Sequence, residues 1–183
     1  MLKKIKLKIG HYILRKAIIK HNHSPQLITL SQAKKVAFLF DAQSSQSVAE
    51  VKSFLKYFLK LNIDVDVLGF IDGVKNKKEY ISTLHINYFN MNDVNFFGVP
   101  NSRKIDTFIN KKYDFLINLS LENSFCTKYL ALLSQSKYRI GVFSKERFFD
   151  YDLMFNLKVK SLGYFIEYLI HYLELINTNN NEK

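Results

Sequence analysis

Polar side chains that could take part in chemistry follow directly after hydrophobic runs of strand length. Asp41 ends the run from Val36 to Phe40, and Asp72 ends a second run. In an open parallel sheet, ligands bind beyond the carboxyl ends of the strands, where the strand order reverses. We therefore predict a crevice for a polar small molecule at these strand ends. The candidate ligand-binding residues are Asp41, Gln43, Ser44, Ser120, Glu122, Asn123 and Ser144.

Helix capping is the competing interpretation of three of these residues. Ser44, Ser120 and Asn123 stand before segments with helical periodicity. Side chains of this kind accept hydrogen bonds from the free N–H groups of a first helical turn, whatever the function of the protein. Residues that only cap helices would leave the crevice without a functional role.

The glycine content argues against a bound nucleotide. Dinucleotide-binding and P-loop proteins need glycines where the backbone closes on a phosphate. Residues 41–46, the turn after the first run, contain no glycine, and the six glycines of the chain never form a G-x-G pair. We therefore expect no cofactor.

Neither the cysteine nor the closely spaced histidines predict a catalytic or metal site. Cys126, the single cysteine, precedes Tyr129 and Leu130 by three and four residues on one apolar helical face, so we expect a buried structural thiol. His21 and His23 have no apparent third metal ligand. We assign no catalytic residue and no metal ligand.

Strand-like and helix-like segments alternate along the chain, as in βαβ units. The expected strands are residues 36–40, 65–71, 86–89, 113–119, 138–143 and 153–159. The expected helices are residues 47–61, a segment after Pro100, and residues 122–133 and 162–177. Because βαβ crossovers are almost always right-handed, this pattern predicts a three-layer α/β sandwich with a mostly parallel, Rossmann-like sheet of five or six strands.

The chain is expected to divide into a basic amphipathic arm and linker (residues 1–31), one α/β domain (residues 32–177) and a disordered tail (residues 178–183). Basic residues interrupt the arm too often for a signal peptide, and no stretch approaches the ~18 apolar residues that span a membrane. A single cysteine fits a reducing compartment. These features predict a cytoplasmic protein, with peripheral attachment at the inner face of the membrane as an option.

Positive charge is concentrated at the amino-terminal end of the chain. Residues 1–35 contain nine of the 27 Lys and Arg residues and none of the 16 acidic residues. The rest of the chain, with eighteen basic residues, is nearly balanced. Because blocks of like charge repel one another, such a segment indicates contact with an anionic partner.

A helical arm would separate its side chains into two faces. Four basic residues fall on one narrow stripe, which is our candidate for contact with an anionic surface: Lys4, Lys8, His11 and Arg15. Four apolar residues fall on the opposite side: Leu2, Ile5, Ile9 and Ile13. The alternation in residues 4–9 would also suit a strand, and Gly10 weakens a helix by about 1 kcal/mol relative to alanine.

Three interpretations of this helix remain open. Residues 1–22 could bury their apolar side in an anionic membrane, lay their lysines along RNA, or pack on their own domain. A protein partner is a further option. Only four of the basic residues are Arg, the preferred reader of guanine, so we expect no reading of DNA sequence.

Two resemblances to known families are visible. Patches along the whole chain resemble a family of uncharacterised Bacteroidota proteins that carries a domain of unknown function; these patches are residues 36–41, 67–70, 95–100, 114–120 and 151–154. Residues 113–119 and 138–141 are similar to the amino-terminal half of heptosyltransferase-like GT-B glycosyltransferases. The first resemblance implies no activity. The second implies that this chain corresponds to one half of such an enzyme and lacks the domain that binds the sugar nucleotide. That favours a binding role over sugar transfer.

The leading hypothesis is therefore a non-enzymatic α/β binding or adaptor domain whose basic amino-terminal helix meets an anionic surface or packs on its own domain. The alternative is a small enzyme or ligand-binding protein that uses the crevice, related to glycosyltransferases but without their donor domain. A pocket that joins Asp41, Ser120 and Glu122 would favour the alternative.

Overall fold

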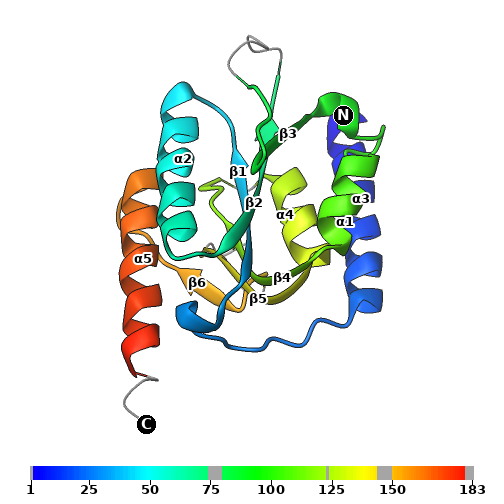
Figure 1. Ribbon diagram of the computed structural model, residues 1–183. Helices are drawn as coiled ribbons and strands as arrows, with labels where there is room; N and C mark the ends of the chain where they lie inside the picture. The colour runs from blue at the N-terminus through cyan, green and yellow to red at the C-terminus, as the bar shows by residue number, and fades with distance from the viewer. Residues whose placement is uncertain (1, 74–79, 123, 144–149, 180–183) are drawn as a thin grey trace.

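A parallel β-sheet forms the centre of the molecule. The computed structural model describes residues 2–73, 80–122, 124–143 and 150–179. Within these residues, six strands, all parallel, lie between two layers of helices (Figure 1). Their order, β3-β2-β1-β4-β5-β6, is that of a Rossmann sheet. The predicted three-layer α/β sandwich is confirmed.

The central strands are buried on both faces. The strands are β1 (Lys35–Asp41), β2 (Asp64–Ile71), β3 (Ile86–Asn90), β4 (Lys112–Asn118), β5 (Gln135–Val142) and β6 (Leu153–Phe155). The run from Val36 to Phe40 is at most 1% exposed, as is typical of a strand covered on both sides. β6 is shorter than the predicted strand 153–159. Phe155 pairs with Val142, where β5 ends, so later residues have no strand beside them.

Among the described residues, two helices cover one face of the sheet and three cover the other (Figure 1). The first pair is α2 (Ser45–Lys60) and α5 (Leu162–Asn179), and the second group is α1 (Leu2–His21), α3 (Arg103–Asn110) and α4 (Phe125–Leu133). Two short 3-10 helices are η1 (Leu30–Gln32) and η3 (Met91–Asp93). The predicted amino-terminal helix is present. No described helix is long and apolar enough to span a membrane.

The carboxyl end of the chain differs slightly from the prediction. α5 continues to Asn179, so two residues of the predicted tail 178–183 belong to the helix. The rest of the predicted tail lies outside the described residues.

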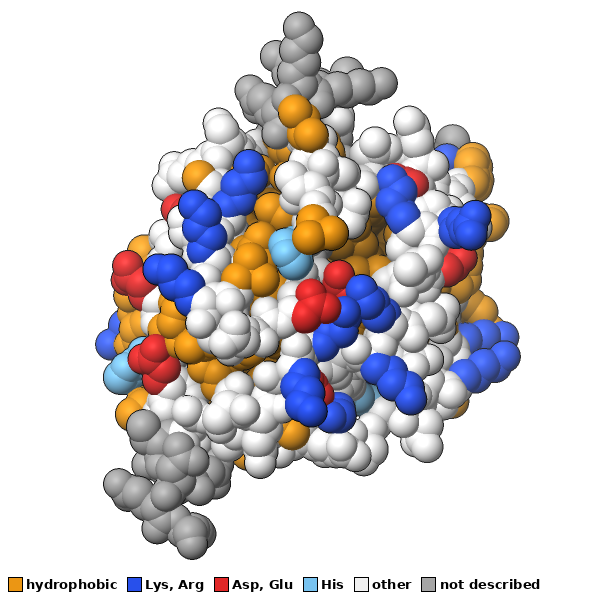
Figure 2. Space-filling view, in the orientation of Figure 1, with side chains coloured by type: hydrophobic (Ala, Val, Ile, Leu, Met, Phe, Trp, Pro, Cys, Tyr) orange, Lys and Arg blue, Asp and Glu red, His pale blue; other side chains and the backbone are white. Residues whose placement is uncertain are grey.

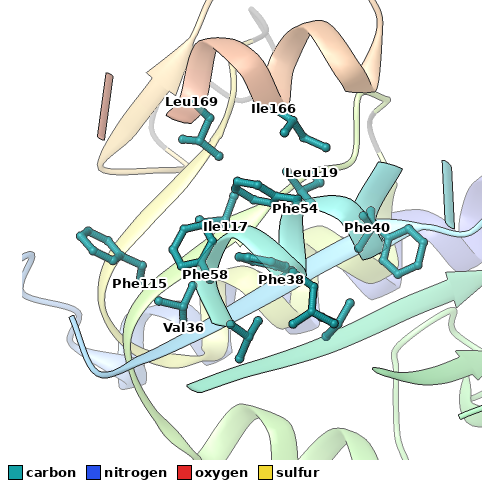
Figure 3. Packing of buried hydrophobic residues seen from close by; sticks show 14 of the residues in the cluster. Val36, Phe38, Phe40, Phe54, Phe58, Phe115, Ile117, Leu119, Ile166 and Leu169 are labelled. Atoms are coloured by element: carbon teal, nitrogen blue, oxygen red, sulfur yellow. The ribbon is translucent and has the colours of Figure 1, made fainter. Parts of the chain in front are cut away.

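Aromatic residues fill the space between the sheet and the layer of α2 and α5 (Figure 3). Phe38 of β1 stacks on Phe54 of α2 with the ring centroids 4.6 Å apart, and Phe58 meets Phe38 edge-on at 5.2 Å. Burying one such side chain contributes about 1.5–3 kcal/mol. Gly69 of β2 makes room for this packing, because a Cβ atom there would lie 2.7 Å from the ring of Phe40. The core thus fixes β1 in the middle of the sheet.

The strand order places a switch point between β1 and β4. From β1 the chain builds outward through β2 to β3, and it then returns through α3 to β4 on the other side of β1. β1 leads into α2 and β4 leads into α4, and these helices lie in opposite layers (Figure 1). Connections that diverge in this way leave a crevice beyond the strand ends.

Candidate functional site

Two adjoining hollows, which together we call the crevice, lie beyond the carboxyl ends of β1 and β4. The first has a volume of about 440 Å³, and its polar wall consists of Asp41, Gln43, Asp72, Glu122 and Ser124, with His11 and Cys126. The second, of about 270 Å³, has a polar wall of Asp41, Gln43, Ser44, Ser47, Ser120, Glu122 and Lys160. Three residues, Asp41, Gln43 and Glu122, line both hollows. The pocket that joins Asp41, Ser120 and Glu122 is therefore present.

Asp41, the last residue of β1, is half-buried between the two hollows. Burial is the main cause of a raised pKa at its carboxyl group, and the negative charges of Glu122 and Asp72 raise that pKa further. Hydrogen bonds with the hydroxyl groups of Ser120 and Ser124 act in the opposite direction. A carboxyl group whose pKa is shifted in this way, within a hollow, is typical of functional sites.

Ser120 belongs to a buried polar network beneath the crevice. Its amide donates to Oδ1 of Asn118 at 3.1 Å, and its hydroxyl oxygen lies 3.0 Å from Oγ1 of Thr127. Asn118 in turn donates from Nδ2 to the hydroxyl of Tyr151 at 2.7 Å. The network fixes the connection from β4 to α4. Ser120 does not cap α4, whose N-cap residue is Ser124.

The capping interpretation is correct for Ser44. Its hydroxyl accepts a hydrogen bond from the amide of Ser47 at 3.1 Å, and the hydroxyl of Ser47 accepts one from the amide of Ser44 at 3.2 Å. Such a reciprocal pair satisfies backbone amides at the start of a helix. In nucleotide-binding proteins, amides at this position bind phosphate. The first turn of α2 is thus partly occupied by the protein itself.

The first hollow is negatively charged in a chain with a formal net charge of +11. Its described lining contains three carboxylates and neither Lys nor Arg. Several carboxylates elsewhere form ion pairs, as Asp114 does with Lys137 at 2.7 Å. Among the described residues, no ion pair joins Asp41, Asp72 or Glu122 to a basic side chain. In the same part of the chain, no group of three or more His, Cys, Asp or Glu residues could hold a metal ion.

Cys126 and His11 add two neutral groups to the crevice. Burial raises the pKa of the Cys126 thiol to about 12, and Asp41 and Asp72 add to the effect. The thiol is therefore protonated at neutral pH and is a poor nucleophile, and the predicted buried cysteine is confirmed. Burial is also the main cause of a lowered pKa at His11, followed by the charge of Lys128, so the neutral imidazole is favoured.

A further hollow, of about 500 Å³, lies between α3 and β2 and shares no lining residue with the crevice. Two of its lysines have partners of the opposite sign, whereas its Arg103 forms no ion pair among the described residues. Lys111 lies 2.5 Å from Oδ2 of Asp66, and Lys104 lies 2.9 Å from Oδ2 of Asp93. The crevice, and not this hollow, lies beyond the carboxyl ends of β1 and β4 at the switch point of the sheet, so we take the crevice as the candidate site.

α1 contributes a wall to the crevice, a role that the sequence did not indicate. Leu7 and His11 line the first hollow. His11 meets the ring of Phe125 edge-on, with centroids 4.8 Å apart. One turn further along, Leu14 is 2% exposed and packs against Leu132 of α4. The helix is therefore part of the domain.

The face of α1 that packs on the domain differs from the predicted apolar side. It passes through Gly10 and Leu14, whereas Ile5 and Ile9 are 50% and 37% exposed. A Cβ atom at residue 10 would lie 2.7 Å from the carbonyl oxygen of Phe97, so glycine permits the close approach. A glycine inside a helical pattern often has such a packing reason, and it is the signal that could have identified this face.

Two histidines fasten the carboxyl end of α1 and the following linker. Nε2 of His21 lies 2.9 Å from the carbonyl oxygen of Ser134, before β5. Nε2 of His23 lies 2.9 Å from Oδ2 of Asp152, before β6. These contacts tie residues 21–23 to the amino-terminal end of the sheet.

Comparison with known proteins identifies a family. Residues 6–176 match DUF6913, which is described as a family of unknown function. The chain belongs to the DUF6913 family. The match begins within α1, so the DUF6913 unit includes most of the basic helix. A search of curated proteins found no match.

The predicted resemblance to a domain of unknown function is thus confirmed, and DUF6913 membership assigns no role to any residue. In this DUF6913 protein, five predicted ligand-binding residues surround the crevice: Asp41, Gln43, Ser44, Ser120 and Glu122. Asn123 and Ser144 lie outside the described residues. Of the predicted anionic-surface contacts, Lys8 and Arg15 are exposed and His11 lies against Phe125. The side chain of Lys4 is not among those described.

Proposed function

We propose that this chain is a binding domain whose small-molecule ligand occupies the crevice beyond β1 and β4. One observation carries the proposal. Asp41 is a half-buried carboxyl group with a raised pKa at the switch point of a Rossmann-ordered sheet, and it shares the crevice with the carboxylates of Asp72 and Glu122. Ligands of open α/β sheets bind at this point.

The chemistry of the wall favours a ligand that carries an amine or several hydroxyl groups. Ionised carboxylates only accept hydrogen bonds, so they match ligand groups that donate. Leu7, Phe70 and Phe125 supply an apolar surface for a hydrocarbon part of the same ligand. In the first hollow a phosphate group would be repelled by the carboxylates, and beside the second hollow the cap of Ser44 already uses part of the first turn of α2.

Binding is the preferred role because the crevice offers no activated nucleophile among its described residues: the thiol of Cys126 is held in its protonated form. The second candidate is acid–base catalysis by Asp41, which the raised pKa of that carboxyl group favours. The Bacteroidota source, the relationship to glycosyltransferases and the cytoplasmic location stay predictions from the sequence.

A thermal-shift screen tests this function. The melting temperature of the full chain is measured with small amines, sugars, nucleotides and inorganic phosphate. We expect an amine or a polyhydroxyl compound to raise the melting temperature of the wild type, because a ligand that binds only the folded state stabilises it. Asp41→Asn is expected to weaken that binding by at least about tenfold. The matched control is Asp106→Asn, which changes an exposed carboxylate on α3.

Two outcomes contradict the proposal: stabilisation by phosphate compounds alone, and undiminished binding in Asp41→Asn. Chemical conversion of a bound compound, lost in Asp41→Asn and retained in Asp106→Asn, would favour the second candidate over simple binding.

A further inference from the structure

One face of α1 is turned away from the domain. Leu14 and His21 point inward, and the residues half a turn from them point outward. Three apolar residues on the outward side, seven positions apart, form what we call the apolar ridge: Ile5, Tyr12 and Ile19. Seven residues are close to two helical turns, so the three side chains lie in one line. They are 50%, 57% and 81% exposed.

Basic residues flank the apolar ridge on both sides. Lys8 and Arg15 follow one side and Lys16 and Lys20 follow the other, and all four are exposed. α1 contains no Asp or Glu. In Figure 2, hydrophobic and basic side chains lie next to one another along the right-hand edge, where Figure 1 places α1 and α3.

A second segment widens the apolar surface. Phe96, which follows η3, is 70% exposed and lies beside α1. The Nζ atom of Lys6 is 3.5 Å from the centroid of its ring, a cation–π contact that holds the aromatic side chain next to the helix. The exposed surface is therefore shared by the helix and the segment before α3.

Charge and composition decide which partner fits this surface. A second copy of the chain would bring two sets of cations together and would be repelled. RNA would match the cations but leave Ile5 and Ile19 without an apolar partner, and α1 has a single Arg, Arg15, for stacking on bases. An anionic lipid surface satisfies both kinds of side chain at once.

We propose that α1 binds the surface of an anionic membrane. The helix lies in the plane of the membrane, and the apolar ridge enters the boundary between headgroups and acyl chains. The flanking Lys and Arg side chains extend to the headgroups. The opposite face of the helix stays on the domain. This binding does not require a ligand in the crevice.

Sedimentation with vesicles tests the proposal on the full chain. The probes are vesicles of phosphatidylcholine alone and vesicles in which about one third of the lipid is phosphatidylglycerol. We expect the wild type to sediment with the anionic vesicles and to remain in solution with the neutral ones. Added salt should weaken the binding, because it screens the contribution of the lysines.

Two variants of α1 separate the contributions. Replacing the apolar ridge (Ile5→Ser, Tyr12→Ser, Ile19→Ser) should reduce binding to anionic vesicles by at least about tenfold, because the buried apolar area is lost. Replacing flanking cations (Lys8→Gln, Arg15→Gln, Lys20→Gln) should give a similar loss and remove most of the salt dependence. A matched control removes three exposed lysines of α2 instead (Lys52→Gln, Lys56→Gln, Lys60→Gln) and should bind like the wild type.

Circular dichroism melting confirms that each variant is folded, which is expected because every substituted side chain is exposed. Equal sedimentation with both kinds of vesicle, or full binding by the ridge variant, overturns the proposal. A third result would also overturn it: the wild type does not bind anionic vesicles, and both the wild type and the ridge variant bind a single-stranded RNA oligonucleotide. The vesicle results stand even if the thermal-shift screen finds no ligand for the crevice.

Discussion

Asp41 is a residue at which stability and the proposed function oppose each other. Its pKa in the folded chain is raised above the ordinary value of 3.8, mainly because of burial. The folded state therefore holds this proton more tightly than the unfolded state. The stability that results is complete below the ordinary pKa and is lost as the pH rises through the folded value. At neutral pH the ionised carboxylate thus lowers the free energy of unfolding.

We expect Asp41→Asn to raise the free energy of unfolding at neutral pH by about 0.5–2 kcal/mol, the usual size of a single stabilising substitution. The gain should shrink as the pH falls toward the ordinary pKa, because the wild-type carboxyl group then becomes protonated as well. Urea unfolding of both proteins at several pH values measures the effect. A variant that is less stable at every pH would show that the ionised carboxylate is stabilised by its neighbours.

At the scale of the element, α1 is placed by a close approach at Gly10. Alanine in a helix interior is usually more stable than glycine by about 1 kcal/mol. At residue 10, however, the added Cβ atom would meet the backbone oxygen of Phe97 at 2.7 Å. Backbone cannot move aside as the end of a flexible side chain can, so α1 would have to shift.

We therefore expect Gly10→Ala to destabilise the chain by about 1–3 kcal/mol, the usual cost of overpacking. Gly163→Ala in α5 is the matched control, since the nearest atom to its Cβ would be 3.5 Å away. That variant should gain up to about 1 kcal/mol from helix propensity. Urea unfolding measures both. Equal gains at the two positions would mean that α1 is not held against residue 97.

At the scale of the whole molecule, α1 and the sheet form one folded unit. Leu14 packs on Leu132 and Leu133, and these three residues form a small hydrophobic cluster of their own. The family match, which starts at residue 6, also includes most of α1. α1 is thus more than an appended charged segment.

Deletion of residues 1–22 should therefore expose the apolar side of α4 and remove a wall of the crevice. We expect the shortened chain to bind a hydrophobic dye strongly and to elute in part as aggregates in size-exclusion chromatography, because large exposed apolar patches promote association. The cation variant of α1 serves as the control, since it loses charge but keeps the packing. A shortened chain that stays monomeric and melts at the wild-type temperature would contradict this prediction.

The sheet was largely predictable because continuous apolar runs such as Val36 to Phe40 mark strands covered on both faces. The short length of β6 was not predictable, because β6 ends where its partner strand β5 ends and its own sequence does not show that position. The site was predictable in outline, since Asp41 ends β1 and Glu122 follows β4, and the topology makes these two strands neighbours. The inward face of α1 was not, because apolar residues occur around the whole helix and only Gly10 distinguishes one side.

The two faces of α1 have a joint thermodynamic consequence. Leu7 and His11 belong to the wall of the crevice, and the apolar ridge belongs to the outer surface of the same rigid helix. A shift of α1 on a bilayer would change the shape of the cavity, and a molecule in the cavity would bias the position of the helix. Linkage then requires reciprocity: vesicles must alter the affinity for the small molecule by the same factor by which that molecule alters the affinity for vesicles.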